Sequence, residues 1–339
     1  MIMRRLRVSL KGWGGVGAMA LACALAVVLA LLLPLTQPDP EDGAGLGGRG
    51  IAQGVQAKAG DCGAHPEDLS PAPSGDESGT TIQKIKKRGY LTVGVDQNSY
   101  RWGYRDPNST KENVELEGFD IDLARRIAEE ILGSPDDIRF RAIPTDQRIE
   151  AIQDGRVDMV VRTMTISCKR LEQVAFSAPY FVTGQQVLAP ETSDIKGYDK
   201  SLAGKKVCTA QGSTANEKLA DDKESGKLPA SVDISETVPN QLDCLVRLQL
   251  GEADAVVTDG ALAASQAAQD PTVQLKGETF TTEYYGVAMK KDAGDLVRRV
   301  NRVLEDYRKD GWQKSYDRWL AATLPEDSPS SSAPAAHYK

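Results

Sequence analysis

Histidine is nearly absent from this chain. Of its 339 residues only two are histidines, His65 and His337, and no two cysteines are separated by just two residues. Zinc sites are built mainly from cysteine and histidine, and a Ser-His-Asp triad needs a histidine base. The sequence therefore argues against a zinc centre and against triad catalysis, and we expect neither a metal nor another cofactor.

A surplus of positive charge is lacking as well. The chain has 41 basic and 48 acidic side chains, for a net charge of -7. Proteins that bind nucleic acid use basic patches to neutralise phosphate, so nucleic acid is not an expected partner. The hydrophobic content of 40% is enough for buried cores, and the length predicts about two domains.

The N-terminus is the most distinctive region of the chain. An apolar run over residues 16–35 follows a cluster of basic side chains, Arg4, Arg5, Arg7 and Lys11. A run of about 20 residues matches one bilayer crossing and is long for a signal-peptide core. Flanking basic residues stay cytoplasmic, which places the rest of the chain outside. We expect residues 1–37 to be an uncleaved anchor or an atypical signal. The ALAC sequence at 20–23 loosely resembles a lipobox, so lipidation at Cys23 remains an alternative.

The composition of two segments predicts disorder. Residues 38–80 are rich in glycine, proline, aspartate and serine without an apolar period, which predicts a disordered linker. Residues 325–339 predict a disordered tail. The folded part is therefore expected at 81–324.

Apart from Cys23, the chain has four cysteines, an even number in a sequence that reads as exported. Disulfides are expected in that setting, and four cysteines can pair in three ways. The sequence leaves the connectivity open. The pairing that we expect is Cys208 with Cys244 and Cys62 with Cys168.

The folded part alternates short apolar strands with amphipathic helices. Strands are expected at 90–95, 139–143 and 157–161, with helices at 118–132 and 146–154. A second set has strands at 206–209, 254–257 and 285–289, with helices at 213–220, 261–268, 296–310 and 312–320. This alternation predicts an α/β protein with mainly parallel sheets and helices on both faces. Two such units leave a cleft between them, where small ligands usually bind.

Several short motifs occur in a specific order. They are GFDIDL at 118–123, RI at 148–149, DGRVD at 154–158, TMTIS at 163–167, FSAPY at 176–180, GST at 212–214 and DAVVTD at 254–259. Together they resemble bacterial extracellular solute-binding protein family 3, the polar amino-acid receptors of ABC importers, over about residues 82–322.

The resemblance implies a type II periplasmic-binding-protein-like fold with two Rossmann-like lobes. Lobe 1 would comprise about residues 82–180 and 285–322, and lobe 2 about residues 185–280. Two hinge strands would join them, at Tyr180 to Gly184 and at Thr281 to Tyr284. Glycine is reasonable in a hinge because it tolerates large changes in backbone dihedral angle.

The resemblance also implies a ligand site. Arg170 would hold the α-carboxylate of an amino acid, with contacts added by Thr163 and Thr165. A guanidinium suits this role because its planar fork donates two parallel hydrogen bonds. Asp259 matches the family's ammonium-binding carboxylate. It also ends a strand before a helix, so its side chain could equally be a plain N-cap.

A helix is expected to open at Gly212, Ser213 and Thr214. The free N–H groups and the dipole at a helix N-terminus favour an anion, so Thr214 and the nearby backbone are candidate ligand contacts. Ordinary capping by Ser213 is the alternative interpretation.

Three further residues follow the first strand. Asp96 could line the cleft or cap a turn. Tyr100 or Trp102 could pack against the aliphatic part of a ligand, as aromatic residues do in similar proteins, or could be loop aromatics without such a role.

Arg148 decides the expected substrate. Acidic-amino-acid receptors of the family carry an arginine at this position, directed at the side-chain carboxylate. A second buried cation would favour a ligand with net negative charge, because an unpaired charge in a closed cleft is costly. Glutamate or aspartate is therefore expected, with Arg101 as a weaker second cation. Asparagine and glutamine are the alternatives.

The function expected from these features is capture of an acidic amino acid by hinge closure and delivery to an ABC permease. The receptor would be a monomer at the outer face of the cytoplasmic membrane, either anchored by residues 16–35 or secreted. One alternative is a sensory module that signals to a membrane partner and a kinase pathway. A remote alternative is a cleft enzyme such as a dehydratase, with Asp96 or Glu112 as a buried acid. We expect no enzymatic activity.

Overall fold

The computed structural model describes residues 62–110, 112, 114–324 and 326–339, all of which belong to the compact unit 57–339. The expected anchor at 1–37 and Cys23 lie outside the described residues. Within the described part of the chain, no helix combines the length and the apolar character needed to cross a membrane.

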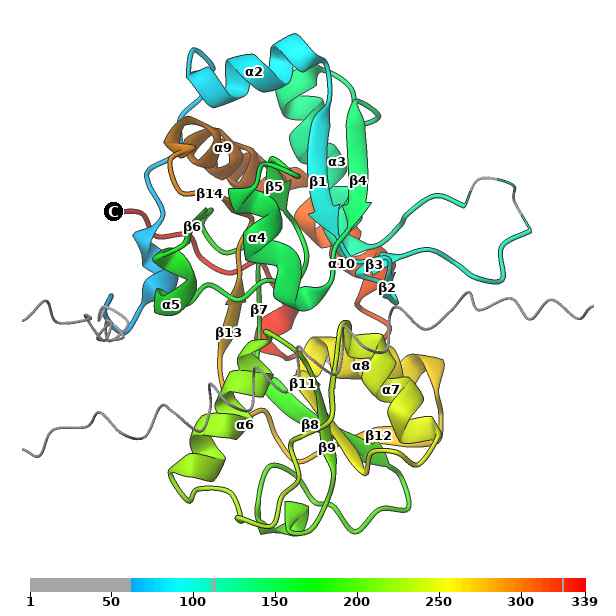
Figure 1. Cartoon of the computed structure of the whole chain (residues 1–339). Helices are drawn as coiled ribbons and strands as arrows, with labels where there is room; N and C mark the ends of the chain where they lie inside the picture. Colours follow the sequence, from blue (N-terminus) through cyan, green and yellow to red (C-terminus); the bar gives the residue numbers. More distant parts are fainter. Residues whose placement is uncertain (1–61, 111, 113, 325) are drawn as a thin grey trace, which may run out of the picture. The chain divides into compact units, whose positions relative to one another are not determined.

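Two five-stranded sheets organise the described residues (Figure 1). The sheet of lobe 1 has the order β4-β1-β5-β14-β6. Its strands are β1 (Leu91–Val95), β4 (Ile138–Ala142), β5 (Met159–Val160), β6 (Val174–Phe176) and β14 (Ala288–Lys290). The helices of lobe 1 are α2 (Thr80–Arg88), α3 (Phe119–Leu132), α4 (Arg148–Gln153), α5 (Cys168–Leu171), α9 (Gly294–Asp310) and α10 (Trp312–Trp319). Every residue of β1 is buried, as expected for a strand covered on both faces.

The sheet of lobe 2 has the order β10-β9-β11-β8-β12. Its strands are β8 (Gln185–Pro190), β9 (Val207–Ala210), β10 (Thr237–Val238), β11 (Ala255–Asp259) and β12 (Val273–Lys276). The helices are α6 (Thr214–Glu224), α7 (Gln241–Gln249) and α8 (Gly260–Gln269). The fold is therefore the predicted α/β architecture with two lobes.

The sheets are less parallel than expected. In lobe 1, β1 runs parallel to β4 and β5, but β14 is antiparallel to β5 and β6. In lobe 2, β9 runs parallel to β10 and β11, but β8 is antiparallel to β11 and β12. The reason is the path of the chain, since β14 and β8 each enter their sheet from the other lobe.

Two short strands connect the sheets. β7 (Phe181–Thr183) leads from β6 to β8, and β13 (Glu283–Tyr285) leads from β12 to β14. They pair antiparallel in the register Thr183 to Glu283 and Phe181 to Tyr285. The expected hinge segments, 180–184 and 281–284, therefore overlap the two connecting strands.

An aromatic cluster forms the core of lobe 1 next to these strands. Trp102 lies with its ring centroid 4.9 Å from that of Phe181 and 5.6 Å from that of Phe119, both in edge-on geometry. Trp102 lies in the turn of a small hairpin, between β2 (Asn98–Ser99) and β3 (Gly103–Tyr104). Gly118, directly before α3, has φ of 130°, and a Cβ there would lie 2.4 Å from the carbonyl oxygen of Trp102. Only glycine fits this approach.

Both expected disulfides are present, joining Cys62 to Cys168 and Cys208 to Cys244. The first joins the N-terminal segment to the start of α5. The second joins β9 to α7 inside lobe 2.

The expected disorder of the linker and the tail is wrong for the parts that the structure describes. Residues 62–79 include a 3₁₀ turn (Pro66–Leu69), and the side-chain amide of Asn301 donates to Ser70 Oγ at 2.8 Å. In the tail, Ser330 Oγ donates to the carbonyl oxygen of Val182 at 2.8 Å, and Lys339 N donates to Ser70 O at 3.0 Å. These polar segments are ordered because their polar groups find partners on lobe 1 and on β7.

Candidate ligand-binding site

A cavity between the lobes collects most of the residues that the sequence singled out. It is lined by Arg148, Thr163, Thr165, Arg170, Ser213, Thr214, Ala215, Gln241, Thr258 and Asp259. An adjoining cavity shares Arg148 and Arg170 and includes Gly212. Lobe 1 contributes both arginines, and lobe 2 contributes Asp259 and the start of α6.

Arg170 is held by the backbone on both sides of the cavity. Ser167 caps α5 with its side chain, and Arg170 is the third residue of that helix. Its Nη1 donates to Thr165 O at 2.8 Å, and its Nη2 reaches across to Gly212 O at 3.2 Å. Burial lowers the pKa of the guanidinium, against the raising effect of acidic groups such as Glu217. The charge is retained in a protein, so the remaining N–H groups are suited to bind an anion.

Asp259 faces the same cavity from the end of β11. Its side chain makes no capping hydrogen bond to α8 and instead accepts a hydrogen bond from Tyr285 Oη. Burial and the negative charge of Glu283 raise the pKa of Asp259 to about 7, although Arg170 and Arg148 oppose the shift. A cation bound in the cavity would favour the ionised carboxylate.

Thr163 carries backbone strain at the cavity wall. Its φ is 40°, in the left-handed region that β-branched residues rarely adopt. The conformation is held by Asp120, whose carboxylate accepts hydrogen bonds from Thr163 N at 3.0 Å and from Tyr180 Oη at 2.8 Å. Burial raises the pKa of Asp120 to about 7. Strain of this kind concentrates at ligand sites, which agrees with the position of Thr163 beside Arg170.

Arg148 is buried, with 3% of its surface exposed, and begins α4. Its Nε donates to Thr145 O at 2.8 Å, and its Nη1 donates to Arg162 O at 3.2 Å. Both partners are neutral carbonyl oxygens, and no ion pair among the described residues includes Arg148. Burial, followed by the positive charges of Arg170 and Arg162, lowers its pKa well below the ordinary value. Arg148 therefore presents a positive charge without a carboxylate partner in the described part of the protein.

The start of α6 lies opposite Arg170. Ser213 caps this helix, since its Oγ accepts a hydrogen bond from Asn216 N at 3.1 Å. The plain capping role is therefore present, and Ser213, Thr214 and Ala215 also line the cavity. The hydroxyl of Thr214 donates to Glu283 Oε2 at 3.1 Å, which joins α6 to the connecting strand β13.

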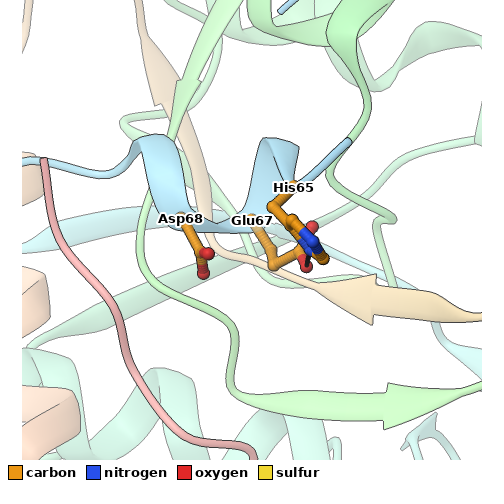
Figure 2. A group of neighbouring side chains, drawn as sticks. All are labelled: His65, Glu67 and Asp68. Atoms are coloured by element: carbon orange, nitrogen blue, oxygen red, sulfur yellow. Dashed lines mark hydrogen bonds and ion pairs between the residues drawn. The ribbon is translucent and has the colours of Figure 1, made fainter. Parts of the chain in front are cut away.

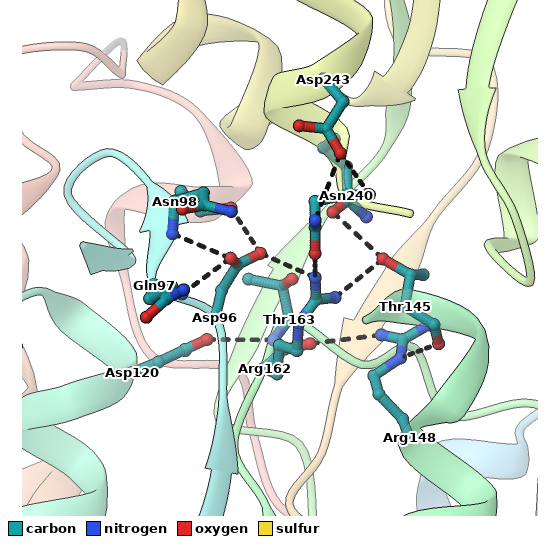
Figure 3. Close-up of polar contacts among 12 residues, drawn as sticks. Asp96, Gln97, Asn98, Asp120, Thr145, Arg148, Arg162, Thr163, Asn240 and Asp243 are labelled. Carbon is teal, nitrogen blue, oxygen red and sulfur yellow. Dashed lines mark hydrogen bonds and ion pairs between the residues drawn. The ribbon is translucent and has the colours of Figure 1, made fainter. Parts of the chain in front are cut away.

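Asp96 does not line this cavity. Its carboxylate forms an ion pair with Arg162, at 2.8 Å between Oδ2 and Nη2 (Figure 3). It also accepts hydrogen bonds from Gln97 N, Asn98 N and Ser99 Oγ. Of the two roles expected for Asp96, the structure shows the turn cap, because these donors and Arg162 occupy its carboxylate oxygens.

Tyr100 and Trp102 also lie elsewhere. Trp102 is fully buried in the aromatic cluster, and its Nε1 donates to Ser265 Oγ at 3.2 Å. Tyr100 lines a separate cavity with residues of α7 and α8. The hairpin β2–β3 turns this segment back onto the core, which carries Trp102 away from Arg170. Arg101 donates to Trp319 O, and Glu112 is exposed.

Several residues at or beside the cavity were not identified from the sequence. Arg162 is fully buried and donates to Thr145 Oγ1 and to Asn240 Oδ1, each at 3.0 Å (Figure 3). Gln241, the first residue of α7, lines the cavity itself. The sequence held a signal for Arg162, since it is a charged residue directly after the buried apolar run at 159–161.

A group of acidic and imidazole side chains lies apart from the cavity, on the turn at 65–68 (Figure 2). His65 Nδ1 is 3.1 Å from Glu67 Oε1, and the ligand atoms of His65, Glu67 and Asp68 lie within 4.8 Å of one another. The side chain of His65 is 73% exposed. Neighbouring acidic groups near the surface are common without an ion, so we assign no metal to them.

Known proteins resemble this chain across both lobes. The model of bacterial extracellular solute-binding proteins, family 3, matches residues 91–322. The ABC transporter glutamine-binding protein GlnH of Bacillus subtilis (strain 168) is 34% identical over 241 residues, covering 71% of this chain and 84% of GlnH. The glutamate-binding protein GluB of Corynebacterium efficiens is 30% identical, covering 74% of this chain and 84% of GluB.

The chain also resembles a protein of known structure. An ancestral arginine-binding protein bound to glutamine is 36% identical, with a TM-score of 0.60, covering 69% of this chain and 98% of that chain. The family match begins at β1 and ends after α10, so it includes both sheets and both connecting strands. The chain therefore belongs to family 3 of the bacterial extracellular solute-binding proteins.

Proposed function

We propose that this protein is an extracytoplasmic receptor for an acidic amino acid, glutamate or aspartate. It closes its lobes over the ligand by bending at β7 and β13, and it delivers the ligand to an ABC permease. The observation that carries the choice of ligand is Arg148, a buried guanidinium bonded only to carbonyl oxygens at the wall of the same cavity as Arg170 and Asp259.

The cavity offers a partner for each end of a zwitterion. Arg170 and the first turn of α6 supply N–H donors for the α-carboxylate, and Asp259 supplies an acceptor for the ammonium group. The two partners approach from different lobes, so one amino acid can contact both at once. Binding at this position favours the closed arrangement, because only that arrangement completes both sets of contacts.

Arg148 then remains for the ligand side chain. A glutamate or aspartate carboxylate would pair with its charge, whereas an uncharged side chain would leave the buried cation unpaired at a cost of several kcal/mol, about 2–5 by analogy with broken charge pairs. The glutamate-binding relative supports this choice. The glutamine-binding relative supports the amide alternative, which the experiment below distinguishes.

The test is calorimetry of the purified protein against the twenty amino acids. We expect glutamate or aspartate to bind most tightly and Arg170→Ala to abolish binding of every amino acid. Arg148→Gln should weaken acidic ligands by about 30-fold or more, from the magnitude above, and affect glutamine much less. Arg156→Gln is the matched control, because its side chain is 39% exposed in the same lobe. Preference for a neutral or basic amino acid would contradict the proposed ligand.

A further inference from the structure

The ion pair between Asp96 and Arg162 lies directly behind the cavity wall. Arg162 precedes the cavity residue Thr163, and its carbonyl oxygen accepts the hydrogen bond from Arg148. The exposed fraction is 0% for Arg162 and 6% for Asp96. Both residues belong to lobe 1, so the pair does not depend on contact between the lobes.

Asp96 has no acceptor capacity to spare. Its Oδ1 accepts from Gln97 N at 2.8 Å and from Asn98 N at 2.9 Å. Its Oδ2 accepts from Ser99 Oγ at 2.9 Å and pairs with Arg162 at 2.8 Å. A carboxylate has about four acceptor positions, so all of them are occupied. A ligand amide or guanidinium would therefore find no acceptor on Asp96.

The charges of this pair act on Arg148 in opposite directions. The negative charge of Asp96 stabilises the charged guanidinium of Arg148, whereas the positive charge of Arg162 destabilises it. With both present, the two effects oppose each other. If Arg162 were neutral, the negative charge of Asp96 would add to that of Asp259 in stabilising Arg148, and the cavity would have less need of a ligand carboxylate.

We propose that Arg162 is a specificity-determining residue that acts through Asp96. By neutralising and saturating that carboxylate, it keeps the positive charge of Arg148 available for an acidic ligand side chain. The proposal rests on the proposed function, since it explains why this cavity selects an acidic amino acid rather than an amide or a basic one.

Arg162 also contacts the other lobe, and this second role must be separated from the first. Its Nη2 donates to Asn240 Oδ1 at 3.0 Å, and Asn240 lies in lobe 2 just before α7. Loss of this contact would weaken closure over every ligand alike. It would not change the ratio of two ligand affinities. Asn240→Ala is therefore the control for closure.

The experiment measures the affinities of the whole protein for glutamate, aspartate, glutamine and arginine. The readout is the ratio of acidic to amide affinity for each variant. Arg162→Gln should lower this ratio by about tenfold or more, which is the order expected for the interaction of one buried unit charge at an effective dielectric constant of about 20. Asp96→Asn leaves Arg162 unpaired, so it should raise the ratio. The double variant, Arg162→Gln with Asp96→Asn, removes both charges and should return the ratio to within about threefold of wild type.

Opposite signs for the two single variants distinguish specificity from folding, because a purely structural role would lower all affinities in both. An unchanged ratio in the single variants, or a shift of the same sign in both, would overturn the proposal. If Arg162→Gln does not fold by circular dichroism, the rise expected for Asp96→Asn decides the matter alone. The wild-type protein tests the proposed function separately. If it prefers glutamine, the proposed acidic ligand is wrong, but the change in the ratio of acidic to amide affinity between variants still tests the role of Arg162.

Discussion

The two disulfides allow a quantitative test within one protein. Cys62 and Cys168 are separated by 106 residues, and Cys208 and Cys244 by 36. In the chain-entropy model, closing loops of these lengths stabilises the fold by about 4.8 and about 3.8 kcal/mol, respectively, because a longer loop loses more unfolded-state freedom. The bond that holds α5 should therefore contribute about 1 kcal/mol more than the bond inside lobe 2.

The bonds are best compared one at a time. A variant with Cys208→Ala and Cys244→Ala retains only the long-range bond, and a variant with Cys62→Ala and Cys168→Ala retains only the other. Each protein is unfolded thermally without ligand, first oxidised and then fully reduced, and followed by circular dichroism. Comparing oxidised with reduced protein cancels the packing lost by the substitutions. About 1 kcal/mol corresponds to about 2–4 °C in a domain of this size.

We expect reduction to lower the melting temperature more in the protein that retains Cys62–Cys168. Reduction of that protein should also weaken glutamate binding, because α5 has only four residues and carries Arg170. An equal or smaller shift than in the other protein would refute the loop-length reasoning. It would indicate that the N-terminal segment stays associated with lobe 1 in the unfolded chain.

Two further predictions concern the site and the core. Burial raises the pKa of Asp259 to about 7, so the carboxyl is mostly protonated below pH 7. Below that pH it must release its proton before it can pair with an ammonium group. Glutamate affinity should therefore weaken by up to about tenfold per pH unit below pH 7 and level off above it. Calorimetry in buffers of different ionisation enthalpy should count one released proton at acid pH, and Asp259→Asn should remove it. In the core, Gly118→Ala should cost about 2–4 kcal/mol in urea unfolding, since the new Cβ would lie 2.4 Å from Trp102 O. Gly133→Ala has positive φ but no atom within 4 Å, so its cost should be only about 1 kcal/mol, and equal costs would contradict the steric explanation.

The elements of the fold followed from local patterns. The buried run of β1 and the amphipathic period of α3 are properties of a few consecutive residues, and both elements formed where they were expected. The helix α7 was missed, although Asn240 and Asp243 have the spacing of a capping box and form one. The strand β8 was also missed, and β14 was expected as a strand but not as an antiparallel one, because strand direction depends on which lobe the chain has just left.

The ordered ends show a second limit of local reasoning. Glycine, proline and serine in the N-terminal segment and the tail gave no apolar period, which predicts disorder. The structure orders Ser70 and Ser330 through hydrogen bonds to groups more than 100 residues away in sequence: Ser70 Oγ donates to Phe176 O and accepts from Asn301, and Ser330 Oγ donates to Val182 O. Composition does not reveal such partners.

The sequence by itself determined the family, the two lobes and most of the residues at the cavity, because motif order and hydrophobic period are local properties that survive in one dimension. Tertiary structure alone decided how the buried charges are shared. Asp96 and Trp102 both follow the first strand, and both were expected to contact the ligand. In the structure, Asp96 pairs with Arg162, and Trp102 joins the aromatic core. Arg148 keeps only carbonyl partners. The partner of a buried charge depends on which distant strand ends and loops meet in space, and that information is absent from any short stretch of residues.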